Sequence, residues 1–313
     1  MYKQAANFFA IIFLMLFQSA AMAIDADEME QERVFQEVIR DRITGPATIS
    51  IADQATIDLP AGYLFIPKAQ TEKLMAAWGA QAENLRYVQG CILPDQFDIG
   101  WMIPITFRND GYISDTDAKN SNMENILKDI KKAAKGVNKE RVSQGYSSLD
   151  IIGWKKKPSY QAETHRFEFA VAIKSQDNTE NSILNTVGTL GREGWLGTTM
   201  IVPAEDYEAT YPHLGKILNT IKFNEGKRYQ DYVESTDKKA SYTLTALIAG
   251  TMAAKKFGLF AILGALLIKF GKLLALVPVL IAARFRKMFS RKKRETENKI
   301  PSPQPSPDTG EGV

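Results

Sequence analysis

The sequence places two apolar runs on either side of a short turn in Ser182-Ile183-Leu184-Asn185-Thr186-Val187-Gly188-Thr189-Leu190-Gly191-Arg192-Glu193-Gly194-Trp195-Leu196-Gly197-Thr198-Thr199-Met200-Ile201-Val202. Residues 182–188 and 195–202 have the composition of buried strands. Gly191, Arg192, Glu193 and Gly194 predict the turn between them. The glycines recur every three residues, but neither Gly-x-Gly-x-x-Gly nor a Gly-Lys-Ser/Thr ending is present, so a turn is favoured over a phosphate-binding loop. We therefore predict a hairpin.

Outward from this hairpin, residues 24–240 alternate between strand and helix periodicity. Strands are expected at residues 48–51, 55–59, 63–66 and 98–107, and in a second hairpin of residues 150–154 and 165–173 with its turn at 155–158. Helices are expected at residues 28–42, 71–78 and 204–221, and after a capping box of Ser121 and Glu124. Strands joined by tight turns, with helices between groups of them, predict an α+β fold with an antiparallel sheet and packed helices. The order of the last elements is similar to that of the Mog1/PsbP-like sandwich.

Composition and charge exclude several classes of protein. The chain has 313 residues, of which 45% are hydrophobic and 24% charged, with one Cys. This profile excludes a disordered chain, a collagen-like repeat and a disulfide scaffold. From residue 241 onward there are 12 Lys and Arg against 4 Asp and Glu, a net charge of +8, so residues 1–240 carry −5 of the total of +3. Basic charge confined to one end, beside an apolar run, favours a membrane as partner over nucleic acid.

The first 23 residues resemble a secretory signal peptide. Lys3 precedes an apolar stretch at residues 8–17, and Ala21-Met22-Ala23 has the small-x-small pattern that signal peptidase cleaves. The alternative is an uncleaved anchor, although ten apolar residues are short for a span of about 20.

A transmembrane helix is expected at residues 257–283, after a helical connector of residues 241–256. Fifteen Leu, Ile, Phe and Val residues at 259–281 contribute about −4 to −9 kcal/mol to insertion, whereas Lys269 and Lys272 near the middle cost about +5 to +7 kcal/mol. Insertion is therefore marginal for an isolated helix, and partners that shield the two lysines would favour it. The alternative is an amphipathic helix at residues 240–284 lying on the membrane surface.

The flanks of this helix predict its orientation. Residues 284–294 contain seven cationic residues in eleven with no acid, which is typical of a cytoplasmic flank. With a cleaved signal peptide, the predicted arrangement is an extracytoplasmic domain, one span of the bacterial inner membrane and a cytoplasmic tail at residues 284–313, Pro-rich at 301–307. Ala246, Gly250 and Ala254 share one helix face and could allow two helices to approach closely.

Residues able to carry catalysis are few and show no recognisable pattern. Cys91, His165 and His213 lack the spacing of a thiol enzyme, and His165 is expected to end a core face. Asp110, Asp115 and Asp117 do not match a calcium loop, because Lys119 stands where an oxygen ligand is needed. We predict no catalytic residue, no metal ligand and no cofactor.

Two further sets of residues have ambiguous roles. Lys155, Lys156 and Lys157 are expected to form a solvated hairpin tip. Trp154 and Trp195 could be core residues or could line a groove.

Several stretches resemble an uncharacterised family of bacterial membrane-anchored proteins with a domain of unknown function. They are Gly45-Pro46, residues 58–63, residues 110–115, Gly145-Tyr146 with residues 152–154, residues 190–194, residues 226–229 and Asp237-Lys238. Family members commonly have an Asn-Tyr pair before the Leu-Gly-Arg turn, where this chain has Asn185-Thr186. The resemblance implies membrane anchoring, but no reaction and no catalytic residue.

These observations together predict a single-span envelope protein whose extracytoplasmic domain binds a protein or ligand, with an envelope protein or a second copy of the chain as candidate partners. One alternative is an envelope hydrolase with a carboxylate site that the sequence cannot assemble. Another is a subunit of a transport assembly, in which Lys269 and Lys272 would face a shared wet interior.

Overall fold

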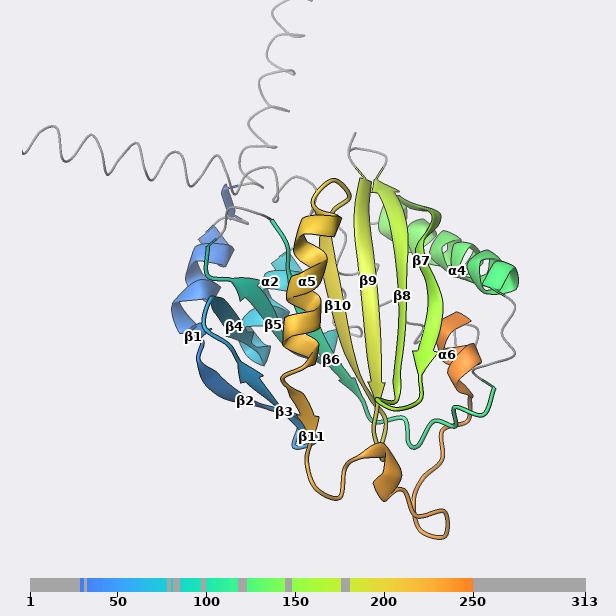
Figure 1. Ribbon diagram of the computed structural model, residues 1–313. Helices are drawn as coiled ribbons and strands as arrows, with labels where there is room; N and C mark the ends of the chain where they lie inside the picture. The colour runs from blue at the N-terminus through green and yellow to red at the C-terminus, as the bar shows by residue number, and fades with distance from the viewer. Residues whose placement is uncertain are drawn as a thin grey trace, which may run out of the picture.

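The architecture is dominated by an eight-stranded antiparallel sheet (Figure 1). The computed structural model describes residues 29–30, 33–77, 80, 85–96, 100–117, 123–143, 148–175 and 181–249. In spatial order the strands are β1 (Ile43–Thr44), β4 (Tyr63–Pro67), β5 (Val88–Pro94), β6 (Ile103–Arg108), β10 (Trp195–Pro203), β9 (Asn181–Leu190), β8 (Arg166–Ser175) and β7 (Leu149–Gln161).

One face of this sheet is covered by a second, smaller sheet and one helix. The small sheet has the order β11 (Ile221–Phe223), β3 (Ala55–Leu59) and β2 (Ala47–Ile51), and α5 (Tyr207–Leu218) lies beside it (Figure 1). A buried apolar cluster fills the space between the layers, with Ile57 from the small sheet, Leu214 from α5 and Val187 from the large sheet. Alternation along the strands explains this, because every second side chain of a strand points to the same face.

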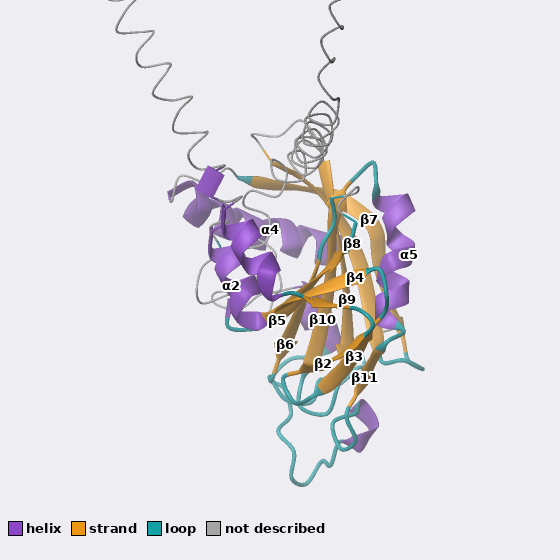
Figure 2. Cartoon of the chain, turned by 90° about the vertical axis from the view of Figure 1, so that its left-hand side faces the viewer, coloured by secondary structure: helices purple, strands orange, loops and turns teal. Residues whose placement is uncertain are grey.

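Helices cover the opposite face (Figure 2). They are α2 (Lys68–Ala77), α4 (Met123–Ser143), α6 (Leu244–Ala249) and a helical segment at residues 33–38 that continues into the 3-10 helix η1 (Ile39–Asp41). Leu74 of α2, Ile130 of α4 and Leu247 of α6 share a second buried cluster with Phe167 and Phe169 of β8. The large sheet thus lies between two apolar cores, and the fold is α+β with an antiparallel sheet, as predicted.

The hairpin predicted from residues 182–202 is confirmed. β9 and β10 pair antiparallel from Ser182 with Pro203 to Leu190 with Trp195. Odd-numbered residues of β9 such as Ile183 and Val187 point toward α5, whereas Leu184 and Leu190 point toward the helical face. Because both faces are covered, both sets are apolar, which explains the continuous apolar run in the sequence.

The second predicted hairpin exists, but the predicted turn is wrong. β7 runs without a break to Gln161 and pairs with β8 through Gln161 and Arg166, with register shifts along its length. The chain reverses at residues 162–165, where His165 has a φ of +50°. The shifts accommodate extra residues in β7, so Lys155, Lys156 and Lys157 lie within an edge strand instead of at a tip. His165 consequently belongs to the turn and does not end a core face.

Two further features of the fold differ from the prediction: the end of one helix, and one strand that was not predicted. The last amphipathic helix ends at Leu218, and Ile221 joins β11, where it pairs with Ile57 of β3. β5 was not predicted, although Cys91, Ile92 and Leu93 form a short apolar run that is buried between β4 and β6.

Among the described residues, no helix combines the length and apolar character needed to cross a membrane. The predicted signal peptide at residues 1–23 and the predicted span at 257–283 lie outside the described residues, as does the basic tail.

Candidate functional site

The turn between β9 and β10, here called the motif turn (residues 190–194), is built by close backbone approach. The Gly191 N–H donates to the Gly194 carbonyl over 2.8 Å, which closes the turn. A Cβ atom added to Gly194 would lie 1.8 Å from the Arg108 carbonyl oxygen. The Gly111 N–H in turn donates to the Glu193 carbonyl over 2.9 Å. Glycine is therefore needed where the motif turn lies against the end of β6.

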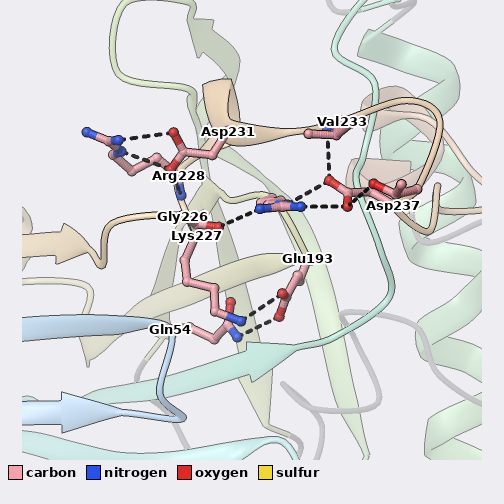
Figure 3. Close-up of polar contacts among 10 residues, drawn as sticks. Gln54, Glu193, Gly226, Lys227, Arg228, Asp231, Val233 and Asp237 are labelled. Carbon is pink, nitrogen blue, oxygen red and sulfur yellow. Dashed lines mark hydrogen bonds and ion pairs between the residues drawn. The ribbon is translucent and has the colours of Figure 1, made fainter.

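Arg192 of the motif turn connects to the segment that follows β11. Its Nε and Nη2 each donate to a different carboxylate oxygen of Asp237 over 2.7 Å, and its Nη1 donates to the Gly226 carbonyl over 3.2 Å (Figure 3). Asp237 also accepts a 2.7 Å hydrogen bond from the Val233 N–H. The Arg192 guanidinium, together with that backbone donor, lowers the pKa of Asp237 well below the usual range. A planar guanidinium that binds both carboxylate oxygens fixes the orientation of the carboxylate and also balances its charge.

Glu193, the next residue, links the same segment to the small sheet. It accepts hydrogen bonds from Lys227 Nζ and from Gln54 Nε2, both over 2.7 Å (Figure 3). Gln54 is 5% exposed and stands between β2 and β3. The hydrogen bond from Lys227 lowers the pKa of Glu193, so the carboxylate is ionised at neutral pH. The motif turn therefore contacts three segments that are far apart in sequence. They are the residues after β6, the turn between β2 and β3, and the segment that follows β11.

The segment of residues 224–249, here called the strap, runs from β11 to the end of α6 and is fastened along its length. The Tyr112 N–H donates to the Lys238 carbonyl, and the Ala240 N–H donates back to the Tyr112 carbonyl, over 2.9 and 2.8 Å. Tyr242 donates its hydroxyl to Asp110, and the Thr245 N–H donates to Asp117 over 3.2 Å. The carboxylates of Asp110 and Asp117 thus hold the strap.

An aromatic cluster brings Tyr229 and Tyr232 of the strap against Tyr112 and His165. Tyr112 stacks on Tyr232 and on Tyr229, with ring centroids 3.8 and 4.6 Å apart, and His165 lies 4.2 Å from the Tyr229 ring. Tyr160 donates its hydroxyl to Asp115 over 2.6 Å. Burial, and then the carboxylate of Asp115, raise the pKa of Tyr160, so this phenol remains a hydrogen-bond donor.

Cys91 and the two histidines lie in different parts of the structure. Cys91 is fully buried in β5 within the core under the helices, and burial raises the pKa of its thiol. His213 is on α5, on the opposite face of the sheet, with its Nδ1 2.9 Å from the Tyr63 hydroxyl. Within the described ranges, no group of three or more His, Cys, Asp or Glu side chains could hold a metal ion.

A buried polar network under α5 was not anticipated from the sequence. Tyr207 donates to Asn185 Oδ1 over 2.6 Å, and Asn185 Nδ2 donates to Glu168 over 3.0 Å. Tyr211 and Lys156 also donate to the Glu168 carboxylate. Lys156 is therefore a network member and not a solvated tip. The available signal was the placement of Glu168 and Asn185 in otherwise apolar strands, because a polar residue inside a buried strand requires a partner.

The two tryptophans and Thr186, which the sequence left ambiguous, are buried or partly buried in the structure. Trp195 is 1% exposed and packs on Phe167, with ring centroids 5.7 Å apart, so it is a core residue and lines no groove. Trp154 is partly buried, with its ring edge-on to Phe169 at 6.0 Å. Thr186 is fully buried on the helical face, next to Thr199. Ala246 lies in α6, whereas Gly250, Ala254, Lys269 and Lys272 are outside the described residues.

Comparisons with known proteins identify a family but no activity. The sequence profile of a family described as "Protein of unknown function (DUF2167)" matches residues 43–280. No match was found among curated proteins. Similar solved structures include cyanobacterial PsbP (CyanoP) from Synechocystis sp. PCC 6803, with a TM-score of 0.35 and 11% identity over 59% of this chain and 92% of that chain. The Ran-binding protein Mog1p of Saccharomyces cerevisiae matches with a TM-score of 0.28 and 10% identity over 56% and 94% of the two chains.

Proposed function

We propose, from the premise that the chain belongs to the DUF2167 family of proteins of unknown function, that it is a membrane-anchored envelope protein. Its α+β domain is a binding module displayed outside the inner membrane. The strap, fastened at the motif turn, leads through α6 toward the anchor that the sequence predicts at residues 257–283.

The bidentate ion pair of Arg192 with Asp237 carries this proposal. It joins a turn of the large sheet to the part of the strap that leads through α6 toward the predicted span. A flexible tether would need no such fastening, because Gly- and Ser-rich linkers serve that purpose without order. The strap is instead held at Arg192, Glu193, Tyr112 and Asp110, four points on the end of the sheet.

Topology is tested with reporter fusions at Lys227 and Glu295. Alkaline phosphatase is active only outside the cytoplasm and green fluorescent protein exported as an unfolded chain is dark, so the two reporters should give opposite results at the two sites. The same compartment at both positions would contradict a single span.

The role of the strap is tested by crosslinking intact cells and purifying the full chain from detergent. Arg192→Ala should reduce the yield of crosslinked partner or of crosslinked dimer, because it releases the strap from the motif turn. Arg228→Ala is the matched control, since Arg228 pairs with Asp231 inside the strap. Equal loss in both variants, or no crosslinked species in the wild type, would count against a binding module.

A further inference from the structure

The solvent-facing side of α4 carries a stripe of lysines. Lys128, Lys132, Lys135 and Lys139 are exposed and spaced four, three and four residues apart, which places them along one side of the helix over about 16 Å. The buried residues Ile126 and Ile130 lie on the opposite side. The stripe is therefore a positively charged, solvent-exposed surface and not part of the core.

The net charge of α4 has the opposite sign to the net charge of residues 1–240. α4 contains six Lys and Arg against three Asp and Glu, a net charge of +3, although residues 1–240 as a whole carry −5. Lys131, on the flank of the helix, is already engaged, since its Nζ donates to the Ile152 carbonyl over 3.0 Å. The four stripe lysines form no ion pair with any residue that the structure describes in full. Exposed apolar side chains lie close by, with Val142 59% and Ile152 47% exposed.

The short chain between α6 and the predicted anchor points to the membrane as the partner. α6 packs against α4, and Leu247 and Ile248 of α6 share a buried cluster with Ile126 and Ile130 of α4. α6 ends at Ala249, eight residues before the predicted span begins at Phe257. Eight residues cover about 12 Å as a helix and at most about 29 Å when extended. The end of α6 is therefore held within that distance of the predicted anchor, and the part of α4 that packs against α6 lies beside it.

We propose that the lysine stripe of α4 binds the anionic headgroups of the membrane surface, so that the domain lies on the membrane instead of standing away from it. This inference rests on the proposed anchor. Clusters of lysines near a membrane are attracted to anionic lipid, and the attraction falls off within a Debye length. Their long side chains also let the ammonium groups reach the headgroups while their stems lie along the apolar surface.

The test uses the full chain reconstituted into nanodiscs, with an environment-sensitive fluorophore attached at Lys135→Cys and lipid-borne quenchers in the bilayer. The native Cys91 is fully buried and stays unlabelled in the folded protein. The control label is at Glu225→Cys, an exposed position on the turn after β11, at the other end of the sheet from α4 (Figures 1 and 2). Nanodiscs of phosphatidylcholine alone are compared with nanodiscs that contain phosphatidylglycerol.

Fluorescence at position 135 should be quenched in the anionic nanodiscs and much less in the zwitterionic ones, while position 225 is unquenched in both. Replacing Lys128, Lys132 and Lys139 with Gln in the labelled chain should remove the quenching, and 1 M salt should weaken it because the Debye length shrinks to about 3 Å. Quenching that is equal at both positions, or unchanged by the Gln substitutions or by lipid charge, would overturn the lipid contact. Extraction of the chain by alkaline carbonate would instead refute the proposed anchor.

Discussion

Gly194→Ala should destabilise the domain by steric conflict alone. The added methyl carbon would lie 1.8 Å from the carbonyl oxygen of Arg108 and 2.9 Å from its carbonyl carbon. Neither atom can move away easily, because the next residue, Trp195, is paired with Arg108 in the ladder between β10 and β6. Arg108 itself is 6% exposed and bonded to Asp110 over 2.7 Å. The backbone of β6 would have to shift together with the loop that holds the strap.

The expected cost follows from the kind of contact. Extra carbon atoms in a packed interior cost about 1–3 kcal/mol, and a clash with backbone belongs at the upper end of that range. We therefore expect a loss of about 3 kcal/mol in the free energy of unfolding at Gly194, which for a domain of 150–250 residues lowers the Tm by about 6–12 °C.

Gly215→Ala is the matched control for this change. Gly215 lies in α5, and a Cβ atom added there would have no neighbour within 4 Å. Alanine in a helix is favoured over glycine by about 0.5–1 kcal/mol, so the control should be neutral or slightly stabilising. Circular dichroism melts of both full-length variants in detergent measure the contrast. A Gly194→Ala protein as stable as the wild type would refute the argument from close approach.

Three further outcomes are expected. Because the Arg192 guanidinium lowers the pKa of Asp237 in the folded chain, their ion pair contributes its full stability above the ordinary pKa of 3.8, and this stability is lost as the pH falls from 3.8 through the lowered pKa of the folded chain. The protection of the strap amides against hydrogen exchange, taken relative to their intrinsic exchange rates at each pH, should therefore decrease in strong acid, whereas Asp237→Asn should lower that protection already at neutral pH. Tyr207→Phe leaves the buried Asn185 carbonyl without its 2.6 Å donor, so urea unfolding should show a loss of about 1–3 kcal/mol with an unchanged m-value, and no loss would mean that the network adds nothing. Burial raises the pKa of Cys91, so a maleimide should label it only after unfolding, and rapid labelling of the folded chain would contradict its placement.

Local sequence patterns predicted much of the secondary structure and failed where pairing depends on distant residues. The β9–β10 hairpin was predictable because its turn and both of its strands lie within about 20 consecutive residues. The turn of the β7–β8 hairpin was misplaced because Lys155-Lys156-Lys157-Pro158 has the composition of a solvent-exposed turn. In the structure Lys156 forms an ion pair with Glu168 of the neighbouring strand β8, and β7 continues past this point with shifts in its register.

The sequence by itself determined the fold class, the apolar faces of the elements and the charge asymmetry, because these follow from periodicity and composition within short windows. Tertiary structure alone brought Arg192 to Asp237, 45 residues away, and Glu193 to Gln54, 139 residues away. It likewise assembled Glu168, Asn185 and Tyr207 from two strands and a helix. The physical reason is that the partner of a polar side chain depends on which strands become neighbours in the sheet, and strand order is set by the packing of the whole domain.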